Sequence, residues 1–256
     1  MQAKLTIEGL RCQFGQFVAL DRVDLQIQEG EFVCVLGASG CGKSTLFNAV
    51  SGLLKPSEGR ILLDGKDISN KPGQVGYMLQ KDMLLPSRSV LGNIVLGASL
   101  TRGANKADYA QAQELAVRYG LGDFLHHYPK ALSGGMRQRV AMMRTVAAGK
   151  SVMLLDEPFG ALDAQTRLSM QQWLLTLWQD LRRTIMFITH DVDEAIFLAD
   201  RIVVMTPRPG RIALILNNPI QRPRTLESLT SASFIDLKRQ IMGLLYGETA
   251  GAHAHD

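Results

Sequence analysis

The strongest signal of the fold in this chain is the sequence Phe32-Val-Cys-Val-Leu-Gly-Ala-Ser-Gly-Cys-Gly-Lys-Ser44. Its first five residues are all apolar and predict a buried strand, and Gly37–Ser44 then has the spacing G-x-x-x-x-G-K-[ST]. A helical pattern at Lys43–Leu53 follows directly. Strand, glycine-rich loop and helix in this order predict backbone N–H groups that point at phosphate oxygens, with the helix dipole behind them. An ordinary glycine-rich turn is the alternative, and the flanking strand and helix disfavour it.

This loop predicts a site for a nucleoside triphosphate and Mg²⁺. Lys43 is placed to reach the β- and γ-phosphates, and the hydroxyl of Ser44 is placed to bind the metal. Cys41 lies in the same loop at the positive end of the helix, so we expect its thiol to have a lowered pKa and a raised reactivity. The residues expected to contact the nucleotide are Gly37, Ala38, Ser39, Gly40, Cys41, Gly42, Lys43, Ser44 and Thr45.

A second apolar run, Val152-Met-Leu-Leu, ends in the carboxylates Asp156 and Glu157. This pattern is typical of a buried parallel strand whose C-terminal end faces a ligand. Asp156 is predicted to hold Mg²⁺, and Glu157 is predicted to act as the general base on the attacking water. A strand that simply ends at a polar surface is the alternative. That alternative weakens here because a phosphate loop in the same chain needs a carboxylate for its metal.

A second helix start that favours anions is predicted at Leu132-Ser-Gly-Gly-Met-Arg-Gln-Arg139. Ser133 is a good N-cap for a helix over Gly134–Ala148, and the two glycines allow a ligand to approach the backbone closely. The alternative is a capped helix with no further role.

Alternating strand and helix patterns predict an α/β fold with a parallel sheet covered by helices. From Lys81 to Gly149 the sequence has helical patterns and no convincing strand, so we expect a helical subdomain inserted between two strands of the core. The expected strands are Lys4–Glu8, Val23–Gln28, Phe32–Leu36, Arg60–Leu63, Val75–Leu79, Val152–Leu155, Ile185–Thr189, Ile202–Met205 and Arg211–Leu216. The expected helices are Lys43–Leu53, Ala104–Tyr119, Gly134–Ala148, Ala164–Leu181, Val192–Leu198 and roughly Phe234–Leu245.

The composition is that of a folded globular protein. The 256 residues are 46% hydrophobic and 20% charged, and the net charge of +4 permits anionic partners without choosing among them. No apolar run approaches the ~18 residues that a membrane-spanning helix needs, and no export signal opens the chain. The three cysteines form no metal-binding or disulfide pattern, so we expect a cytoplasmic location. The tail Gly247–Asp256, with His253 and His255, is expected to be flexible.

Three motifs together resemble the ATP-binding subunits of ABC transporters. Gly37–Ser44 resembles the Walker A motif, Leu132-Ser-Gly-Gly-Met136 the signature sequence and Val152–Glu157 the Walker B motif, in the family's order. The resemblance runs from about Leu5 to Leu245 and implies ATP as the nucleotide, bound by a single ABC ATPase domain over residues 1–256 with a P-loop NTPase (RecA-like) parallel sheet core. It implies that residues 1–80 and 150–216 form this core with an N-terminal antiparallel β subdomain, that 81–149 form the helical subdomain, and that 217–256 form a short helix and a flexible tail.

The resemblance also implies roles for residues outside these motifs. Phe14 matches the aromatic that stacks on adenine, Gln80 the glutamine-loop residue near Mg²⁺ and the attacking water, and His190 the switch histidine at the γ-phosphate. Asp163, in an Ala-Leu-Asp turn, joins the nucleotide-contacting residues. Without the family pattern, a core phenylalanine and a solvated glutamine would be the alternatives.

Each chain has two helix starts that favour phosphate but only one phosphate loop, which predicts a homodimer. If two chains pair head to tail about a two-fold axis, Ser133, Gly134 and Gly135 of one can face the γ-phosphate held by Lys43 of the other. Two ATP molecules would then lie in the interface.

Within the family, Tyr77–Pro86 and Thr206–Ile212 resemble the nitrate, sulfonate and taurine importer branch, although Ser87 stands where branch members often carry Trp. This implies ATP-driven import of such a solute through a separate membrane permease, supplied by a solute-binding protein, with this chain peripheral on the inner face of the membrane. Met83–Pro86 is expected to dock the permease, with internal packing as the alternative. A soluble ABC-type ATPase acting on nucleic acid or ribosomes is the alternative function. It is disfavoured by the single cassette and the lack of a coiled-coil insertion, so no nucleic acid partner is expected.

Two further groups of residues are interpreted as structural. Trp173 and Trp178 are expected to pack on the apolar face of their helix. A solvated basic face is expected for Arg208, Arg211, Arg222 and Arg224, with a site for anionic lipid or a partner subunit as the alternative.

Overall fold

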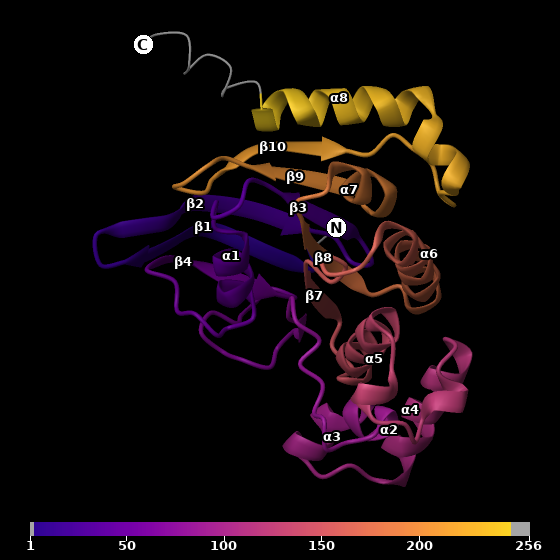
Figure 1. The fold of residues 1–256 in the computed structure, drawn as a ribbon. Helices are drawn as coiled ribbons and strands as arrows, with labels where there is room; N and C mark the ends of the chain where they lie inside the picture. The colour runs from indigo at the N-terminus through magenta and orange to yellow at the C-terminus, as the bar shows by residue number, and fades with distance from the viewer. Residues whose placement is uncertain (1–2, 247–256) are drawn as a thin grey trace, which may run out of the picture. The chain divides into compact units, whose positions relative to one another are not determined.

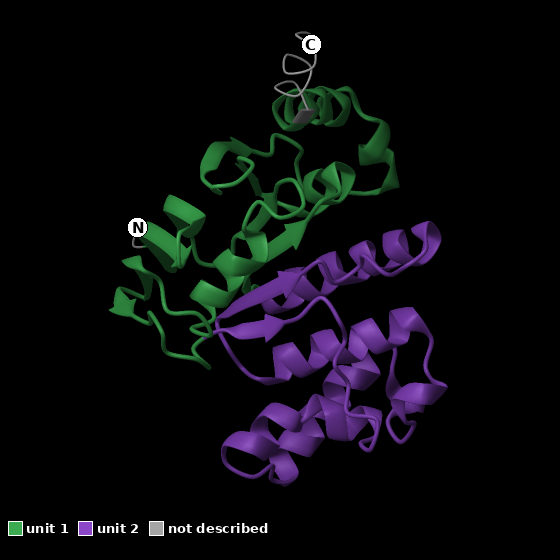
Figure 2. Cartoon of the chain, turned by 60° about the vertical axis from the view of Figure 1, so that its left-hand side comes forward, with its two compact units in different colours: residues 1–74, 182–256 green, residues 75–181 purple. Residues whose placement is uncertain are grey.

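The computed structural model describes residues 3–246, which fall into two compact units. One unit combines residues 1–74 with residues 182–256, and the other comprises residues 75–181 (Figure 2). The tail Gly247–Asp256, with His253 and His255, lies outside the described residues. Among the helices of residues 3–246, none has the length and apolar character needed to cross a membrane.

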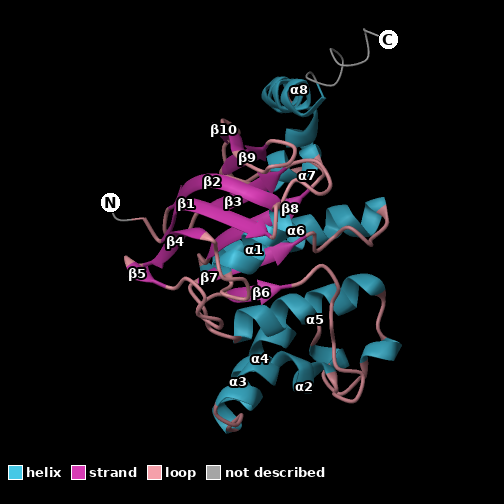
Figure 3. Ribbon diagram, turned by 90° about the vertical axis from the view of Figure 1, so that its left-hand side faces the viewer, coloured by secondary structure: helices cyan, strands magenta, loops and turns pink. Residues whose placement is uncertain are grey.

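The first unit contains an antiparallel sheet of four strands in the order β2-β1-β4-β5 (Figure 3). Both strands of its leading hairpin are longer than the sequence pattern predicts, because register shifts interrupt the alternation of buried and exposed side chains. Gly9 and Arg22, with φ of 54° and 50°, lie at these irregular places. The strands are β1 (Leu5–Phe14), β2 (Phe17–Ile27), β4 (Glu58–Leu63) and β5 (Lys66–Asp67).

A second set of strands in the same unit carries the phosphate loop. The strand β3 (Phe32–Leu36) lies between β8 (Thr184–Thr189) and β9 (Arg201–Met205), parallel to both, and β10 (Ile212–Asn217) adds to β9 in the antiparallel sense. Every residue of β3 and β8 is buried, which explains why both read as continuous apolar runs.

The helices of this unit are α1 (Lys43–Val50), α7 (Val192–Leu198) and α8 (Ala232–Tyr246), with a short 3₁₀ turn at Leu226–Thr230 (Figure 1). The first ends three residues before the predicted Leu53. Gly52 there has a φ of 78°, a left-handed conformation that stops a helix.

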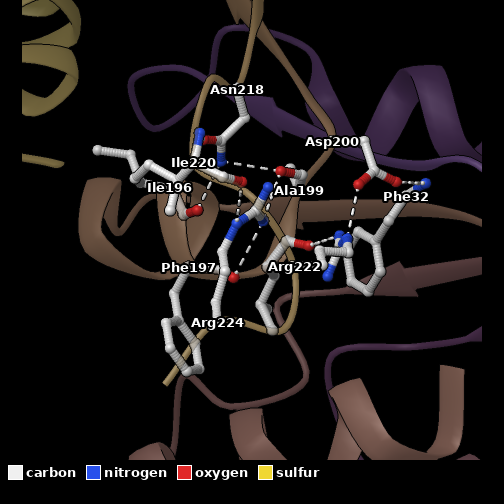
Figure 4. A network of polar contacts seen from close by, with 10 residues as sticks. Phe32, Ile196, Phe197, Ala199, Asp200, Asn218, Ile220, Arg222 and Arg224 are labelled. Carbon is white, nitrogen blue, oxygen red and sulfur yellow. Dashed lines mark hydrogen bonds and ion pairs between the residues drawn. The ribbon is translucent and has the colours of Figure 1, made fainter. Parts of the chain in front are cut away.

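The C-terminal segment closes the end of α7, as Figure 4 shows. Asn218 donates to the carbonyls of Ile196 and Ala199, and the Arg224 Nη1 donates to those of Phe197 and Ala199 at 3.2 and 2.8 Å. The guanidinium of Arg222 donates to the Leu198 carbonyl and pairs with Asp200. The expected solvated basic face is therefore wrong for Arg224, which is 7% exposed, and for Arg222, which is half-buried. These side chains satisfy the carbonyls that every helix leaves open at its C-terminus.

The second unit pairs β6 (Gly76–Met78) with β7 (Val152–Asp156) in parallel, and α6 (Ala164–Leu181) follows β7. Residues 79–151, all of them described, contain helices and turns and no strand. The predicted helical segment 81–149 thus lies inside a unit that also includes β6, β7 and α6. Its helices are α2 (Val90–Ile94), α3 (Leu96–Thr101), α4 (Lys106–Arg118) and α5 (Gly134–Ala147), with 3₁₀ turns at Gly122–Phe124 and Pro129–Ala131.

The two tryptophans of α6 have the packing roles expected for them. Trp178 is buried, and the Trp173 ring packs edge-on against Tyr119 while its Nε1 donates to the Tyr119 carbonyl at 3.2 Å.

Candidate functional site

The phosphate loop depends on glycines that no other residue could replace without strain. Gly40 and Gly42 have φ of 76° and 107°, and a Cβ on Gly42 would lie 2.6 Å from Leu20 Cδ2. A Cβ on Gly37 would lie 2.6 Å from the Cys41 sulfur. Gly42 also begins α1 without a side-chain cap, and the first turn has no acidic residue. The open N–H groups at this helix start therefore suit an anionic ligand.

Lys43 supplies a buried positive charge to this loop. Its side chain is 6% exposed, and Nζ donates to the carbonyls of Gly37 at 2.8 Å and Ala38 at 3.1 Å. The two backbone carbonyls hold the ammonium inside the loop. A phosphate group would give this ammonium a charged acceptor. The loop thus fits the triphosphate expected from the sequence.

The expectation for Cys41 is wrong. Burial raises the pKa of this thiol, and the opposing effect of Lys43 is smaller. The residue is 1% exposed, so the low dielectric surroundings outweigh the helix dipole and the nearby cation. The thiol is therefore protonated and shielded at neutral pH.

Two more predicted site residues belong to the first unit. Phe14 lies at the end of β1 and is 50% exposed, so its ring is accessible to a ligand. His190 is an exposed residue directly after β8. The turn around it is fixed because Thr189 Oγ1 accepts from the Asp191 N–H at 3.0 Å and the Asp191 carboxylate caps α7.

In the second unit, Asp156 ends β7 and is 7% exposed. The Tyr77 hydroxyl, from the neighbouring strand β6, donates to Asp156 Oδ2 at 3.3 Å. Burial first, and then the Asp156 charge, raises the pKa of Tyr77, so the hydroxyl stays protonated as a donor. Sequence reasoning assigned no role to Tyr77. The parallel pairing of β6 with β7 brings Tyr77 close to Asp156, because it places Tyr77 opposite Leu154, two residues before Asp156.

Glu157 and Gln80 come together in the same unit. Gln80 Nε2 donates to Glu157 Oε2 at 3.4 Å, although the two residues are 77 positions apart. Glu157 has a φ of 42°, a left-handed conformation that is costly for a residue with a side chain and that is common at functional sites. The strained backbone and the amide partner both fix the direction of this carboxylate.

Asp156 is the residue of this unit that the sequence assigns to Mg²⁺ through its carboxylate. Within residues 3–246 no group of three or more His, Cys, Asp or Glu side chains could hold a metal ion. Mg²⁺ usually binds through one or two carboxylates, water and substrate phosphates, and Asp156 supplies one such carboxylate at the end of β7.

The signature segment begins α5. Ser133 caps the helix by accepting from the Met136 N–H at 3.3 Å, and no acidic residue occupies the first turn. Gly135 is buried, and a Cβ there would meet Thr166 Cγ2 of α6 at 3.0 Å, so this glycine serves helix packing. Gly134 is the glycine of the pair that remains partly exposed. Asp163 accepts from the Thr166 N–H at 3.0 Å, and this bond lowers the pKa of its carboxyl.

Two arginines of α5 hold the segment that follows Gln80. Arg144 donates to the backbone carbonyls of Asp82 and Met83 at 2.6 and 2.8 Å, and Arg137 Nε donates to the Asp82 carboxylate at 3.2 Å. As a result the Met83 side chain is 57% exposed and that of Leu85 38% exposed.

The chain is similar to known ATP-binding proteins of ABC transporters. Residues 20–160 match the family described as ABC transporter. The chain is 43% identical over 253 residues to the uncharacterized ABC transporter ATP-binding protein MJ0412 of Methanocaldococcus jannaschii, which covers 97% of this chain and 93% of that protein. It is 42% identical over 242 residues to the taurine import ATP-binding protein TauB of Rhizobium johnstonii. This match covers 91% of this chain and 92% of that protein. A dimeric post-hydrolysis structure of the ATP-binding cassette MJ0796, bound to ADP and Pi, has a TM-score of 0.70 at 29% identity and covers 85% of this chain and 100% of that one.

An α/β fold with these motifs is typical of ATP-binding cassettes. The chain belongs to the ABC transporter family. It has the P-loop NTPase fold of ABC cassettes, binds ATP and is an ATPase. The resemblance drawn from the three motifs is confirmed.

Proposed function

We propose that this chain is the ATP-hydrolysing subunit of an importer. It closes as a homodimer around two ATP molecules and drives a separate membrane permease. The similarity to a taurine import ATP-binding protein over 91% of the chain carries this proposal, because that protein is named for import. The proposed solute is small and resembles nitrate, a sulfonate or taurine. A solute-binding protein delivers it, and the chain lies on the cytoplasmic face of the membrane through its contact with the permease.

In the proposed binding mode, Phe14 stacks on the adenine and the phosphate loop holds the triphosphate. The backbone N–H groups from Gly37 to Thr45 bind phosphate oxygens, and Lys43 neutralises the β- and γ-phosphates. Ser44, Gln80 and Asp156 would hold Mg²⁺, which would neutralise the developing negative charge on the phosphates.

Hydrolysis in this proposal uses the carboxylate of Glu157 as the general base. Glu157 orients the attacking water and accepts its proton, while the hydrogen bond from Gln80 keeps the carboxylate in place. His190 donates to a γ-phosphate oxygen from the fixed turn before α7. The Tyr77 hydroxyl holds Asp156 Oδ2, and the Asp156 carboxylate would bind the metal.

The second copy completes each site. The capped start of α5 presents Ser133 and Gly134 with no acidic residue in the first turn, so it suits the γ-phosphate of an ATP bound to the partner. Asp163, directly before α6, is proposed to join these residues at the nucleotide. Loss of the γ-phosphate on hydrolysis then weakens the interface and opens the dimer, which moves the permease.

The exposed side chains of Met83 and Leu85 are the proposed contact with the permease. They lie three and five residues after Gln80, so a shift at the γ-phosphate can reach them through one short segment. Arg137 and Arg144 hold this segment through the Asp82 carboxylate and the Asp82 carbonyl.

The experiment that tests the function is copurification from the native membrane. A tagged chain should bring down an integral membrane permease after detergent extraction, and ATP hydrolysis in the complex should rise when the solute-binding protein and its solute are added. Recovery of nucleic acid or ribosomes without a permease would instead support the alternative ATPase function.

A further inference from the structure

The loop between β9 and β10, residues Thr206–Arg211, lies against both the phosphate loop and β2. The Gly210 N–H donates to the Ala19 carbonyl at 2.9 Å, and the Asp21 N–H donates to the Gly210 carbonyl at 3.0 Å. A Cβ on Gly210 would lie only 2.1 Å from the Cys41 carbonyl oxygen. Only a glycine therefore lets these two backbones approach so closely.

Arg208, at the tip of this loop, makes two contacts that no other side chain of the loop makes. Its Nη2 donates to the carbonyl of Gly40 in the phosphate loop at 3.1 Å. Its guanidinium carbon lies 4.4 Å from the centroid of the Phe17 ring, a cation–π arrangement. Arg211, the other arginine of the loop, instead pairs with Asp21 on β2.

These contacts connect the two places that the proposed binding mode assigns to ATP. Phe17 is the strand partner of Phe14 across the leading hairpin, so the ring under Arg208 belongs to the same turn as the proposed adenine contact. Gly40 belongs to the loop that holds the phosphates. The Arg208 guanidinium thus contacts both the hairpin proposed to bind the adenine and the loop proposed to bind the phosphates. All these residues lie in the first unit.

We propose that Arg208 is a positioning residue for ATP that fixes the separation between the Phe14 hairpin and the phosphate loop. A ligand that carries both a base and phosphates binds more tightly when this separation is fixed, because its second contact then needs no further ordering of the protein. The affinity for a ligand that carries phosphates alone depends little on this separation. This inference rests on the proposed stacking of adenine on Phe14.

The test compares ADP with inorganic pyrophosphate by isothermal titration calorimetry, since neither is hydrolysed by an ATPase. Arg208→Ala should weaken ADP binding about tenfold and pyrophosphate binding less than about twofold. Arg208→Lys, which keeps the charge but loses the planar group that stacks, should give an intermediate loss for ADP. Arg239→Ala removes another exposed arginine of the same unit, paired with Asp236, and should change neither affinity. Thermal unfolding of each variant checks that it is folded.

Equal losses for both ligands would overturn the proposal, because Arg208 would then act on the phosphate loop alone. Unchanged affinities in Arg208→Ala would overturn it as well. Phe14→Ala separates this result from the proposed base contact: if that variant binds ADP like the wild type, the stacking role fails. The ratio of ADP to pyrophosphate affinity in Arg208→Ala still decides whether Arg208 favours the nucleotide.

Discussion

Gln80 Nε2 lies 3.4 Å from Glu157 Oε2 and donates a hydrogen bond to it. The two side chains follow β6 and β7, which pair in parallel, so the sheet itself brings them to the same edge. The amide can fix the carboxylate in the direction needed for an attacking water. This relationship makes Glu157 the first residue to test.

Glu157→Gln should abolish most of the ATPase activity while ATP binding remains. The substitution preserves the shape of the side chain but removes the base, and loss of a general base typically costs 10²–10⁴-fold in rate. Phosphate release measures the turnover, and size-exclusion chromatography with ATP should show a dimer that the wild type does not accumulate. Glu227→Gln, an exposed glutamate in a 3₁₀ turn, is the matched control and should leave turnover unchanged. Normal turnover in Glu157→Gln would remove this residue from the catalytic role.

Ser133→Arg, added to Glu157→Gln, should return the ATP-dependent dimer to monomer. The new side chain places bulk and charge where the partner's γ-phosphate would bind, while the phosphate loop of the same chain is untouched. Light scattering gives the mass, and a fluorescent ATP analogue reports that nucleotide still binds. A double variant that stays dimeric with ATP would show that the start of α5 does not face the partner's nucleotide.

Met83→Asp should uncouple the subunit from its permease. The side chain is 57% exposed beside Gln80, so a new charge should destabilise an apolar contact with little effect on folding. ATPase activity of the isolated subunit should persist while copurification with the permease and transport are lost. Val117→Asp changes an exposed residue of α4, 58% exposed, and should keep both. Normal assembly of Met83→Asp would place the docking contact elsewhere.

How much the sequence predicts depends on how local the determinants are. The phosphate loop follows from residues 32–44 alone, because the strand, the glycines and the helix start are contiguous. Fully buried strands such as β3 and β7 are found at their predicted starts for the same reason. The full extent of β1 and β2 was missed because their bulges depend on cross-strand register.

Contacts between distant segments account for the remaining differences. Cys41 sits at a helix start, which favours a thiolate, yet the chain folds over it and burial prevails. The helix end that Arg224 closes lies 25 residues away from it, so composition alone suggested a solvated charge. The contacts of Tyr77 with Asp156 and of Arg208 with Gly40 were not predicted for the same reason, since the two residues of each pair are far apart in the sequence.

The three cysteines should react slowly with maleimide in the native state. Burial raises the pKa of Cys41, and it raises that of Cys12 to about 11 and that of Cys34 well above its ordinary value. Mass spectrometry after brief labelling at neutral pH should show little modification, and full labelling should appear in guanidinium. Fast labelling of the folded protein at Cys41 would show that the helix dipole outweighs burial.

These thiols also predict how stability depends on pH. A raised folded-state pKa means that the folded protein holds the proton more tightly, so the stabilisation is complete below the pKa of the unfolded thiol and declines as pH rises towards about 11 for Cys12. The free energy of unfolding from urea titrations should therefore fall between about pH 9 and pH 11. Cys12→Ala should flatten part of this decline, whereas an unchanged slope would assign it to other groups.

Arg224→Ala should destabilise the fold by about 3 kcal/mol, because it leaves the end of α7 without its buried donor. Arg224 is 7% exposed and donates to the carbonyls of Phe197 and Ala199, two residues that are themselves buried. Urea unfolding followed by circular dichroism gives the change in midpoint. Arg224→Lys has a single charged donor group in place of the planar fork, so its loss should be smaller. Arg239→Ala, on the exposed side of α8, should change stability by less than about 0.5 kcal/mol. A wild-type midpoint in Arg224→Ala would mean that Asn218 and Arg222 close the helix end without it.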